Sequence, residues 1–443
     1  MSSPTRSSRE MVADWAPEDP ARWDSGLAWR TLWITTYNLT LAFITWFLVS
    51  AIAPKLTSIG FDLTPGQLYW LTAMPGLAGG SLRLIWTFLP PIVGTRKLVS
   101  LSTILFLIPL FGWAFAVQDS STPYAVLLLL AFLAGIGGGV FSGFMPSTSY
   151  FFPKAKQGTA LGLQAGLGNF GVSIVQFVTP WVVGFALAGS LLGAPQTFTN
   201  PETGATKDVW YQNAAYFWVP FVVVGAIVAW LYLKRVPVQA RGVRDQMDIF
   251  SEKHTWTMTY LYVMTFGTFS GFAAVFGLLI KVEFGEFEGA PDPVRYAFLG
   301  ALVGSFARVI TGPVADRIGG GILTVVSGLG IAAGTVFVAV VALPAQSADD
   351  FPAFLWAMLA IFFFAGVGNA STFKQMPMIF EPRQAGGVIG WTAAIAAFGP
   401  FLFGSALSAI SPPVFFWVVA IWSLIGAAMA WWLYARPGAE KPS

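Results

Sequence analysis

The amino-acid sequence predicts an all-α, polytopic membrane protein with twelve transmembrane helices in two six-helix halves. The prediction rests on the composition, on a series of long apolar segments, and on a repeat between the two halves of the chain. Of the 443 residues, 56% are hydrophobic and only 10% are charged, and the mean hydropathy is +0.68. These values are typical of helical membrane proteins and exclude a soluble globular domain of this length.

Twelve apolar segments are long enough to cross a hydrocarbon core of ~30 Å. We expect helices near residues 31–54, 66–90, 98–117, 124–151, 158–190 and 212–233, then near 256–281, 294–316, 320–343, 352–380, 385–408 and 412–434. The basic segment 234–255 separates six helices from six. The predicted organisation is therefore a tail (1–30), an N-terminal half (31–233), a linker (234–255), a C-terminal half (256–434) and a second tail (435–443).

The distribution of basic residues predicts the orientation in the membrane. If the N-terminus is cytoplasmic, 17 of the 24 lysines and arginines lie on the cytoplasmic side, and four lie on the opposite side. The remaining three, Arg83, Arg308 and Lys374, lie within helices. The first thirty residues lack the apolar core of a signal peptide, so we expect them to be a retained tail. Both termini are predicted to be cytoplasmic.

Arg83 and Arg308 are the main candidates for function. Guanidinium stays protonated in proteins, and a charge within a membrane helix costs at least ~3 kcal/mol, so such a residue is a functional candidate by default. Each arginine precedes a loop glycine, Gly94 or Gly319, by eleven residues, which is about 16 Å of helix. Both cations are therefore predicted near the bilayer midplane, where they would form an anion site.

The two halves repeat one another. Arg83 and Arg308 correspond at an offset of 225 residues. Gly137 and Gly139 in the fourth segment correspond to Gly366 and Gly368 in the tenth at an offset of 229. Two six-helix halves with a site between them is the plan of a secondary transporter. A membrane enzyme has no need of such a plan.

Several motifs carry a resemblance to a known family. The stretch GPVADRIGG, with Gly312, Asp316, Arg317 and Gly319, resembles the loop motif of the major facilitator superfamily. The counterpart PPIVGTRK keeps the glycine and the basic pair but lacks the aspartate. The stretches AGLGNFGVS, DWAPEDPARW, FFPKAKQG and YVMTFGTFSGF resemble the nitrate/nitrite porters of the NarK type. The resemblance runs from about Trp15 to the last helix.

The resemblance implies a major facilitator fold in a bacterial inner membrane and a nitrate ion held between Arg83 and Arg308. The implied neighbours of the ion are Asn169 and Tyr262, with Phe43, Phe141 and Phe266 as walls. Residue counts place Asn169 and the three phenylalanines eleven to thirteen residues from the cytoplasmic ends of their helices, about 16–20 Å deep. This is the depth of the arginines, and Tyr262 lies about four residues nearer the cytoplasm.

These residue types suit a small planar anion. The guanidinium fork can offer two parallel hydrogen bonds to two coplanar oxygens of nitrate. A carboxylate would also fit the fork, although a larger substrate should require more polar partners. Gly166, Gly168 and Gly171 would let their helix approach a neighbour closely and bring Asn169 to the site. The alternative to an anion site is that the arginines only pair with backbone carbonyls and that the glycines only allow close helix packing.

Lys374 has two interpretations. It lies eight residues before Pro382, or ~12 Å from the cytoplasmic helix end, so its side chain can extend to the membrane surface. Alternatively it is a third cation on the exit path, and lysine can lose its proton when desolvated. NarK-type exchangers carry glutamine at the corresponding position. The departure favours the proton-coupled branch of the family.

We therefore expect a transporter that moves nitrate, and also nitrite, by alternating access. Proton-coupled nitrate import, as part of nitrate assimilation, is the preferred mode, and nitrate/nitrite exchange is the alternative. The expected partners are nitrate, nitrite, protons and the lipid bilayer, without nucleic acid, and the expected state is a monomer. A nitrate sensor on a transporter fold stays open, and labelled-nitrate counterflow would distinguish it from a carrier.

Other classes of membrane protein fit less well. One histidine and no cysteine cannot supply a bis-histidine haem or a typical metal site, so we expect no cofactor and no metal. A hydrolase would need a buried acid pair or a nucleophile with its base, yet the helix interiors are nearly free of carboxylates. A channel would not require two duplicated halves around a closed midplane site. An enzyme is therefore not expected.

Overall fold

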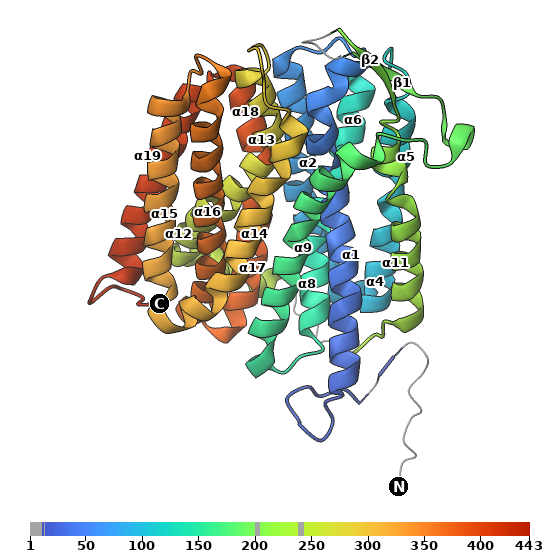
Figure 1. Cartoon of the computed structure of the whole chain (residues 1–443). Helices are drawn as coiled ribbons and strands as arrows, with labels where there is room; N and C mark the ends of the chain where they lie inside the picture. Colours follow the sequence, from blue (N-terminus) through green and yellow to red (C-terminus); the bar gives the residue numbers. More distant parts are fainter. Residues whose placement is uncertain (1–10, 13, 200–203, 238–242) are drawn as a thin grey trace.

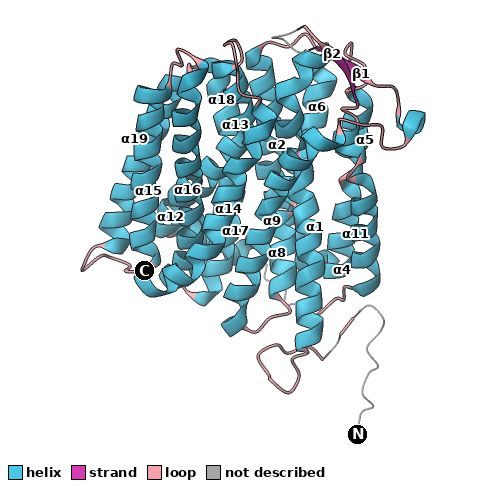
Figure 2. Ribbon diagram, viewed as in Figure 1, coloured by secondary structure: helices cyan, strands magenta, loops and turns pink. Residues whose placement is uncertain are grey.

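The computed structural model describes residues 11–12, 14–199, 204–237 and 243–443. It is a bundle of long, roughly parallel helices with one small sheet at one end (Figures 1 and 2). In this part of the chain, eleven helical segments are long and apolar enough to cross a membrane. The expected second segment is not among them, but it forms the 22-residue helix α2, Pro65–Trp86. The predicted all-α membrane fold is confirmed.

The N-terminal six segments form α1 to α11 and two short 3-10 helices. Their bounds are α1 Ser25–Ile52, η1 Ala53–Ile59, α2 Pro65–Trp86, α3 Leu89–Val93, α4 Thr95–Leu105, α5 Leu107–Ala116, α6 Tyr124–Ala134, α7 Ile136–Gly139, α8 Phe141–Ser149, α9 Lys154–Val182, η2 Gly189–Leu192, α10 Asn213–Tyr216 and α11 Val219–Tyr232. Several expected helices are therefore divided into two or three consecutive pieces.

The remaining segments form the 3-10 helix η3 in the linker and the helices of the C-terminal half. Their bounds are η3 Val243–Ser251, α12 Lys253–Tyr262, η4 Val263–Gly267, α13 Thr268–Phe284, α14 Pro293–Ile318, α15 Gly320–Phe337, η5 Val338–Ala342, η6 Ala348–Asp350, α16 Phe351–Ile379, α17 Pro382–Ala396, α18 Gly399–Ala409, α19 Pro412–Ala430 and η7 Trp431–Ala435. Within the predicted linker, residues 238–242 lie outside the described part.

The structure differs from the expected boundaries most clearly after the fifth segment. The helix expected to reach residue 190 ends at Val182. An antiparallel hairpin follows, with β1 (Gln196–Thr199) paired to β2 (Thr206–Val209). The hairpin lies beside the N-terminal helices, at the end of the bundle opposite the start of α1 (Figure 1). Apolar composition alone could not mark this end, because the residues after Val182 are still largely apolar and small.

Glycines allow the long helix α9 to pack closely against both halves of the bundle. A Cβ at Gly171 would lie 2.4 Å from the backbone oxygen of Thr40 in α1. On the other side of α9, a Cβ at Gly166 would lie 2.9 Å from Val309 in α14. The helix that carries Asn169 is therefore held directly against one helix of each half.

The described part of the N-terminal tail is docked onto the loop between α8 and α9. The indole nitrogens of Trp15 and Trp23 donate to the backbone oxygens of Tyr150 and Phe151, each at 2.9 Å. The Lys156 ammonium lies 4.4 Å from the centre of the Trp23 ring, a cation–π contact. The two motifs that contain these residues are therefore in direct contact.

The close packing of α9 on α1 makes a testable prediction. Replacing Gly171 by alanine should force α9 and α1 apart, because the added carbon would overlap a backbone oxygen that cannot move freely. Gly162→Ala is the matched control in the same helix, since a Cβ there meets no atom within 4 Å. Alanine has the higher helix propensity, by about 1 kcal/mol, so Gly162→Ala should raise the melting temperature of the purified protein, whereas Gly171→Ala should lower it. Equal effects would contradict this packing.

Candidate functional site

Arg83 occupies the last turn of α2 and is completely buried. Its Nε donates to the backbone oxygen of Gly138 at 2.9 Å, and one terminal nitrogen donates to the backbone oxygen of Ala393 at 2.6 Å. Gly138 lies in the same half as Arg83, whereas Ala393 lies in the other half. The second terminal nitrogen of Arg83 has no hydrogen-bond partner in the described residues.

Aromatic rings surround the Arg83 guanidinium. Its central carbon lies 4.5 Å from the centre of the Phe141 ring, 5.4 Å from Trp46 and 5.5 Å from Phe266. The Phe43 ring meets that of Phe141 edge-on, with centroids 6.2 Å apart. Ring faces attract cations but offer no hydrogen bonds. The cage stabilises the positive charge without consuming the remaining donor.

Arg308 lies in α14 and is 6% exposed. Its guanidinium carbon lies 5.1 Å from the centre of the Phe373 ring on α16. The Asn169 amide, assigned so that both its atoms meet suitable partners, accepts from an Arg308 terminal nitrogen at 3.1 Å and donates to the Ala165 oxygen at 3.3 Å. Arg308 is therefore held by a residue of the opposite half, as Arg83 is held by Ala393.

Tyr262 connects the two arginines. Its ring stacks on that of Phe266, with centroids 5.4 Å apart and planes 9° apart. The wide π-helical turn Val263–Gly267 separates the α-helices on either side and sets the relative positions of the two rings. Both guanidinium groups interact electrostatically with the Tyr262 hydroxyl and with each other. The hydroxyl lies within reach of the Arg308 guanidinium but makes no hydrogen bond of good geometry in the described residues, so one site contains both cations and donors that a ligand could use.

The charge of this site is not compensated by protein groups. Among the described residues, no ion pair includes Arg83 or Arg308. In the same part of the chain, no group of histidine, cysteine and acidic residues is arranged to hold a metal ion. Two guanidiniums, an amide and a phenol, lined by aromatic rings, can bind a small anion.

The structure brings the seven predicted binding residues together around the arginines. Arg83, Phe43, Phe141 and Asn169 come from the N-terminal half, and Arg308, Tyr262 and Phe266 come from the C-terminal half. Of the predicted signature glycines, Gly166 packs against α14, and Gly168 and Gly171 pack against Leu39 and Thr40 of α1. The glycines therefore set the position of α9, and Asn169 is the residue that reaches the site.

Lys374 and the loop motif lie elsewhere. The Lys374 side chain is exposed, although the preceding residue, Phe373, contacts Arg308. Arg317 is exposed in the last turn of α14. Gly319 links α14 to α15 at a φ of 98°, which strongly favours glycine. A Cβ at Gly312 would meet no atom within 4 Å, and the side chain of Asp316 lies outside the described part.

Two side chains and two backbone groups of this site were not predicted from the sequence. Trp46 and Phe373 each contact an arginine, and the oxygens of Gly138 and Ala393 fix Arg83. Trp46 follows Phe43 by three residues and so shares its helix face. Phe373 adjoins Lys374 on α16. These sequence positions could have indicated Trp46 and Phe373, although Phe373 is one of forty phenylalanines. The backbone oxygens that bind Arg83 could not be predicted from side-chain types.

Comparisons with known proteins identify the family of the chain. Residues 37–397 match the family model described as the Major Facilitator Superfamily. The chain is 65% identical over 437 residues to "Probable nitrate/nitrite antiporter NarK2" of Thermus thermophilus, which covers 97% of this chain and 98% of the relative. It is 35% identical over 459 residues to "Nitrate/nitrite transporter NarU" of Salmonella typhimurium, with 97% of each chain covered.

A solved structure with a similar fold is that of a bacterial homolog of the human lysosomal transporter Spinster, in an inward-facing and unoccupied conformation. The TM-score is 0.64 and the sequence identity is 15%, with 92% of this chain and 97% of that chain covered. At this identity the likeness shows the fold alone.

Proposed function

Because the chain belongs to the Major Facilitator Superfamily, and within it to the NarK-like nitrate/nitrite porters, we propose that it carries nitrate and nitrite across a bacterial inner membrane by alternating access. Members of this family are transporters, so the chain is a transporter and not an enzyme. With both termini cytoplasmic, the β-hairpin end of the bundle faces outward. One chain supplies both arginines, so a single copy contains the whole site.

The observation that carries the proposal is the uncompensated pair of buried arginines. Charges in a low-dielectric site need a counter-charge, and the surrounding rings and amide supply none. Nitrate is planar and singly charged, and its oxygens could accept from the unused nitrogen of Arg83 and the hydroxyl of Tyr262. Its weakly hydrated faces suit the walls formed by Phe141 and Phe266. Nitrite offers the same oxygen pair in a smaller ion.

The same charges favour exchange of one anion for another. Arg83 and Arg308 repel each other when no anion lies between them, and neither can lose its proton. Closing the two halves around an empty site is therefore unfavourable, and each reorientation should require a bound anion. Obligate nitrate/nitrite exchange is the direct consequence of two permanent cations.

The first test replaces either arginine by lysine. Lysine keeps the positive charge but lacks the planar guanidinium group. At position 83 it could not hold the two backbone oxygens and the anion together. At position 308 it could not hold the Asn169 amide and the anion together. Arg83→Lys and Arg308→Lys should each lower nitrate counterflow in proteoliposomes at least about tenfold. Arg295→Lys, at an exposed arginine outside the site, is the matched control and should transport normally. Near-normal transport by either site variant would contradict a two-fork site.

A second test concerns Asn169. Its amide holds Arg308 across the two halves, and its loss removes a hydrogen bond to a charged group, worth about 1.5–3 kcal/mol. Asn169→Ala should raise the half-saturation constant for nitrate by about tenfold or more, with the amount of folded protein unchanged. Asn38→Ala removes a buried amide that is bonded to Thr103 and Ile34 instead. That control should leave the constant unchanged, and an unchanged constant in Asn169→Ala would assign the residue to packing alone.

Proton-coupled import is the second candidate, and Lys374 favours it. The residue follows Phe373, which contacts Arg308, and it is a titratable cation where exchangers of the family carry glutamine. The Lys374 side chain is exposed and lies outside the site in this structure, so coupling requires the anion to pass close to the lysine on its exit path. An anion there would favour the charged form of the lysine, and its departure would favour loss of the proton. Proton and nitrate would then bind cooperatively, which allows net uptake driven by a proton gradient.

Lys374→Gln separates the two modes. If the lysine couples protons, the variant should keep nitrate/nitrite exchange and lose nitrate accumulation driven by a pH gradient, because its side chain no longer titrates. Lys97→Gln, at an exposed lysine of α4, controls for the loss of one surface charge. Accumulation should be measured together with proton flux in liposomes of purified protein. A wild-type protein that exchanges anions without moving protons establishes the exchange mode instead.

A further inference from the structure

At the β-hairpin end of the bundle, the two halves are in contact along one face of α13. Ala273, Gly277 and Lys281 are spaced four residues apart and share one helix face. Their partners in the N-terminal half, from the site outward, are Gln176, Pro54 and Thr57. The Gln176 amide donates to the Ala273 oxygen at 2.8 Å, a Cβ at Gly277 would lie 3.2 Å from Pro54, and the Lys281 ammonium donates to the Thr57 hydroxyl.

An ion pair completes this seam. The ammonium of Lys55 in η1 lies 2.8 Å from a carboxylate oxygen of Asp292, the residue that caps the N-terminus of α14. The side chains are 17% and 37% exposed, so the pair is shielded from water more than a surface salt bridge. Lys55 belongs to the N-terminal half and Asp292 to the C-terminal half. The pair therefore holds the outer ends of the halves together.

Lysine side chains gather at this seam. Of the four basic residues predicted for the outer side, three gather here, and the fourth, Arg295, is exposed on α14. The ammonium groups of Lys55 and Lys207 lie 5.4 Å and 5.1 Å from the centre of the Phe198 ring. Lys55 and Lys281 are close enough to repel each other electrostatically. Glu283 follows Lys281 by two residues and lies on a different face of α13.

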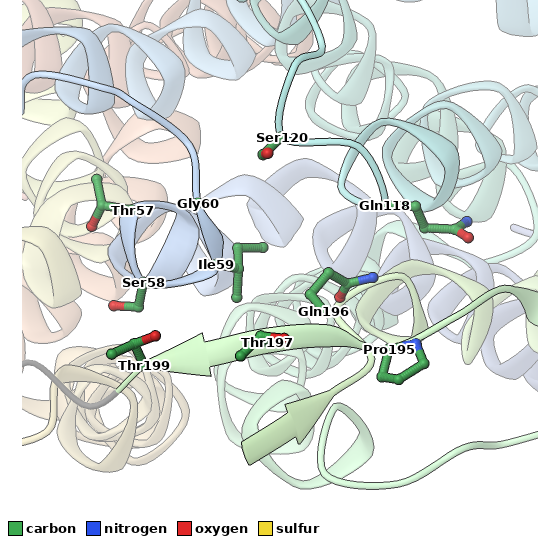
Figure 3. A pocket seen from close by; sticks show the side chains of 10 residues that line it. All are labelled: Thr57, Ser58, Ile59, Gly60, Gln118, Ser120, Pro195, Gln196, Thr197 and Thr199. Carbon is green, nitrogen blue, oxygen red and sulfur yellow. The ribbon is translucent and has the colours of Figure 1, made fainter. Parts of the chain in front are cut away.

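A polar cavity of about 670 Å³ lies beside the seam (Figure 3). Hydroxyl and amide side chains dominate its lining, among them Thr57, Ser58, Gln118, Ser120, Gln196 and Thr197. Thr57 also accepts the hydrogen bond from Lys281, and Thr197 is the strand neighbour of Phe198. The cavity therefore adjoins the seam through Thr57, although the lysines themselves are not part of its lining.

We propose that Lys55 and Lys281, with Lys207 beside them, form an outer capture site for nitrate, in which Asp292 is a tethered anion that the substrate displaces. A carboxylate and a nitrate present the same pair of coplanar oxygens to an ammonium group. When nitrate takes the place of Asp292 on Lys55, the ion pair between the halves is lost. Arrival of the substrate thereby loosens the outer seam. The inference rests on the proposed transport of nitrate and on the proposed orientation.

The test uses two variants with opposite expected effects. Lys55→Gln removes the capturing cation and should raise the KM for nitrate entering from the outer side about fivefold, because a cationic cleft concentrates anions. Asp292→Asn removes the competing anion and should lower the same KM about threefold. Initial uptake into right-side-out vesicles gives the KM. Arg295→Gln and Glu288→Gln, at exposed residues of the same side, are the matched controls and should behave as the wild type.

A second measurement reports opening of the seam directly. The chain contains no cysteine, so Ala273→Cys, at a buried position in the seam, introduces a single thiol. Nitrate should speed its reaction with a membrane-impermeant maleimide, and Asp292→Asn should speed the reaction without nitrate.

The outcomes separate the capture site from the transport function. If wild-type protein carries no nitrate, the proposed function fails. If wild type carries nitrate but Lys55→Gln and Asp292→Asn keep the KM of their controls, only the capture site is overturned. If Lys55→Gln does not fold, Asp292→Asn decides alone, and an unchanged or raised KM overturns the inference. If both variants raise the KM equally, the Lys55–Asp292 ion pair has only a structural role, and this result also overturns the proposed capture site.

Discussion

Two guanidinium groups that cannot lose their protons are buried in one site without a carboxylate, and the rest of the structure depends on this constraint. An uncompensated charge in a low-dielectric interior is costly. Here the charge of Arg83 is stabilised by two backbone oxygens and three aromatic rings, and that of Arg308 by one amide and one ring. These partners reduce the cost without neutralising the charge, and an anion can still bind.

The partners of the arginines also connect the two halves. Arg83 of the N-terminal half donates to Ala393 of the C-terminal half, and Arg308 of the C-terminal half donates to Asn169 of the N-terminal half. Each cation is therefore held by a group that must move relative to it when the halves rock. In the proposed alternating-access cycle, a bound anion would replace part of these contacts and so couple its binding to the movement between the halves.

The sequence predicted the helices because their apolar length follows from the bilayer, and the same thickness underlies the depth expected for the site. Apolar length, loop charge and the repeat of Arg83 at Arg308 are imposed by hydrocarbon thickness and by duplication. The π-turn between Tyr262 and Phe266, the end of α9 at Val182 and the carbonyl partners of Arg83 were not predictable. They depend on packing between segments distant in sequence, and a backbone oxygen has no residue type that could mark it.

The inner site and the outer seam differ in whether a carboxylate lies beside their cations. At the inner site a protein carboxylate beside Arg83 or Arg308 would compete with the substrate and allow the halves to close without it. The described residues place none there. At the outer seam, Asp292 pairs with Lys55 and holds the halves together, and in the proposed capture site a substrate anion would displace it. The inner site would thus require a bound anion before the halves close, and no carboxylate of the described residues replaces that anion there. At the outer seam, the carboxylate of Asp292 would be displaced when an anion arrives. If both proposals hold, the placement of one acidic side chain distinguishes the inner binding site from the outer capture site.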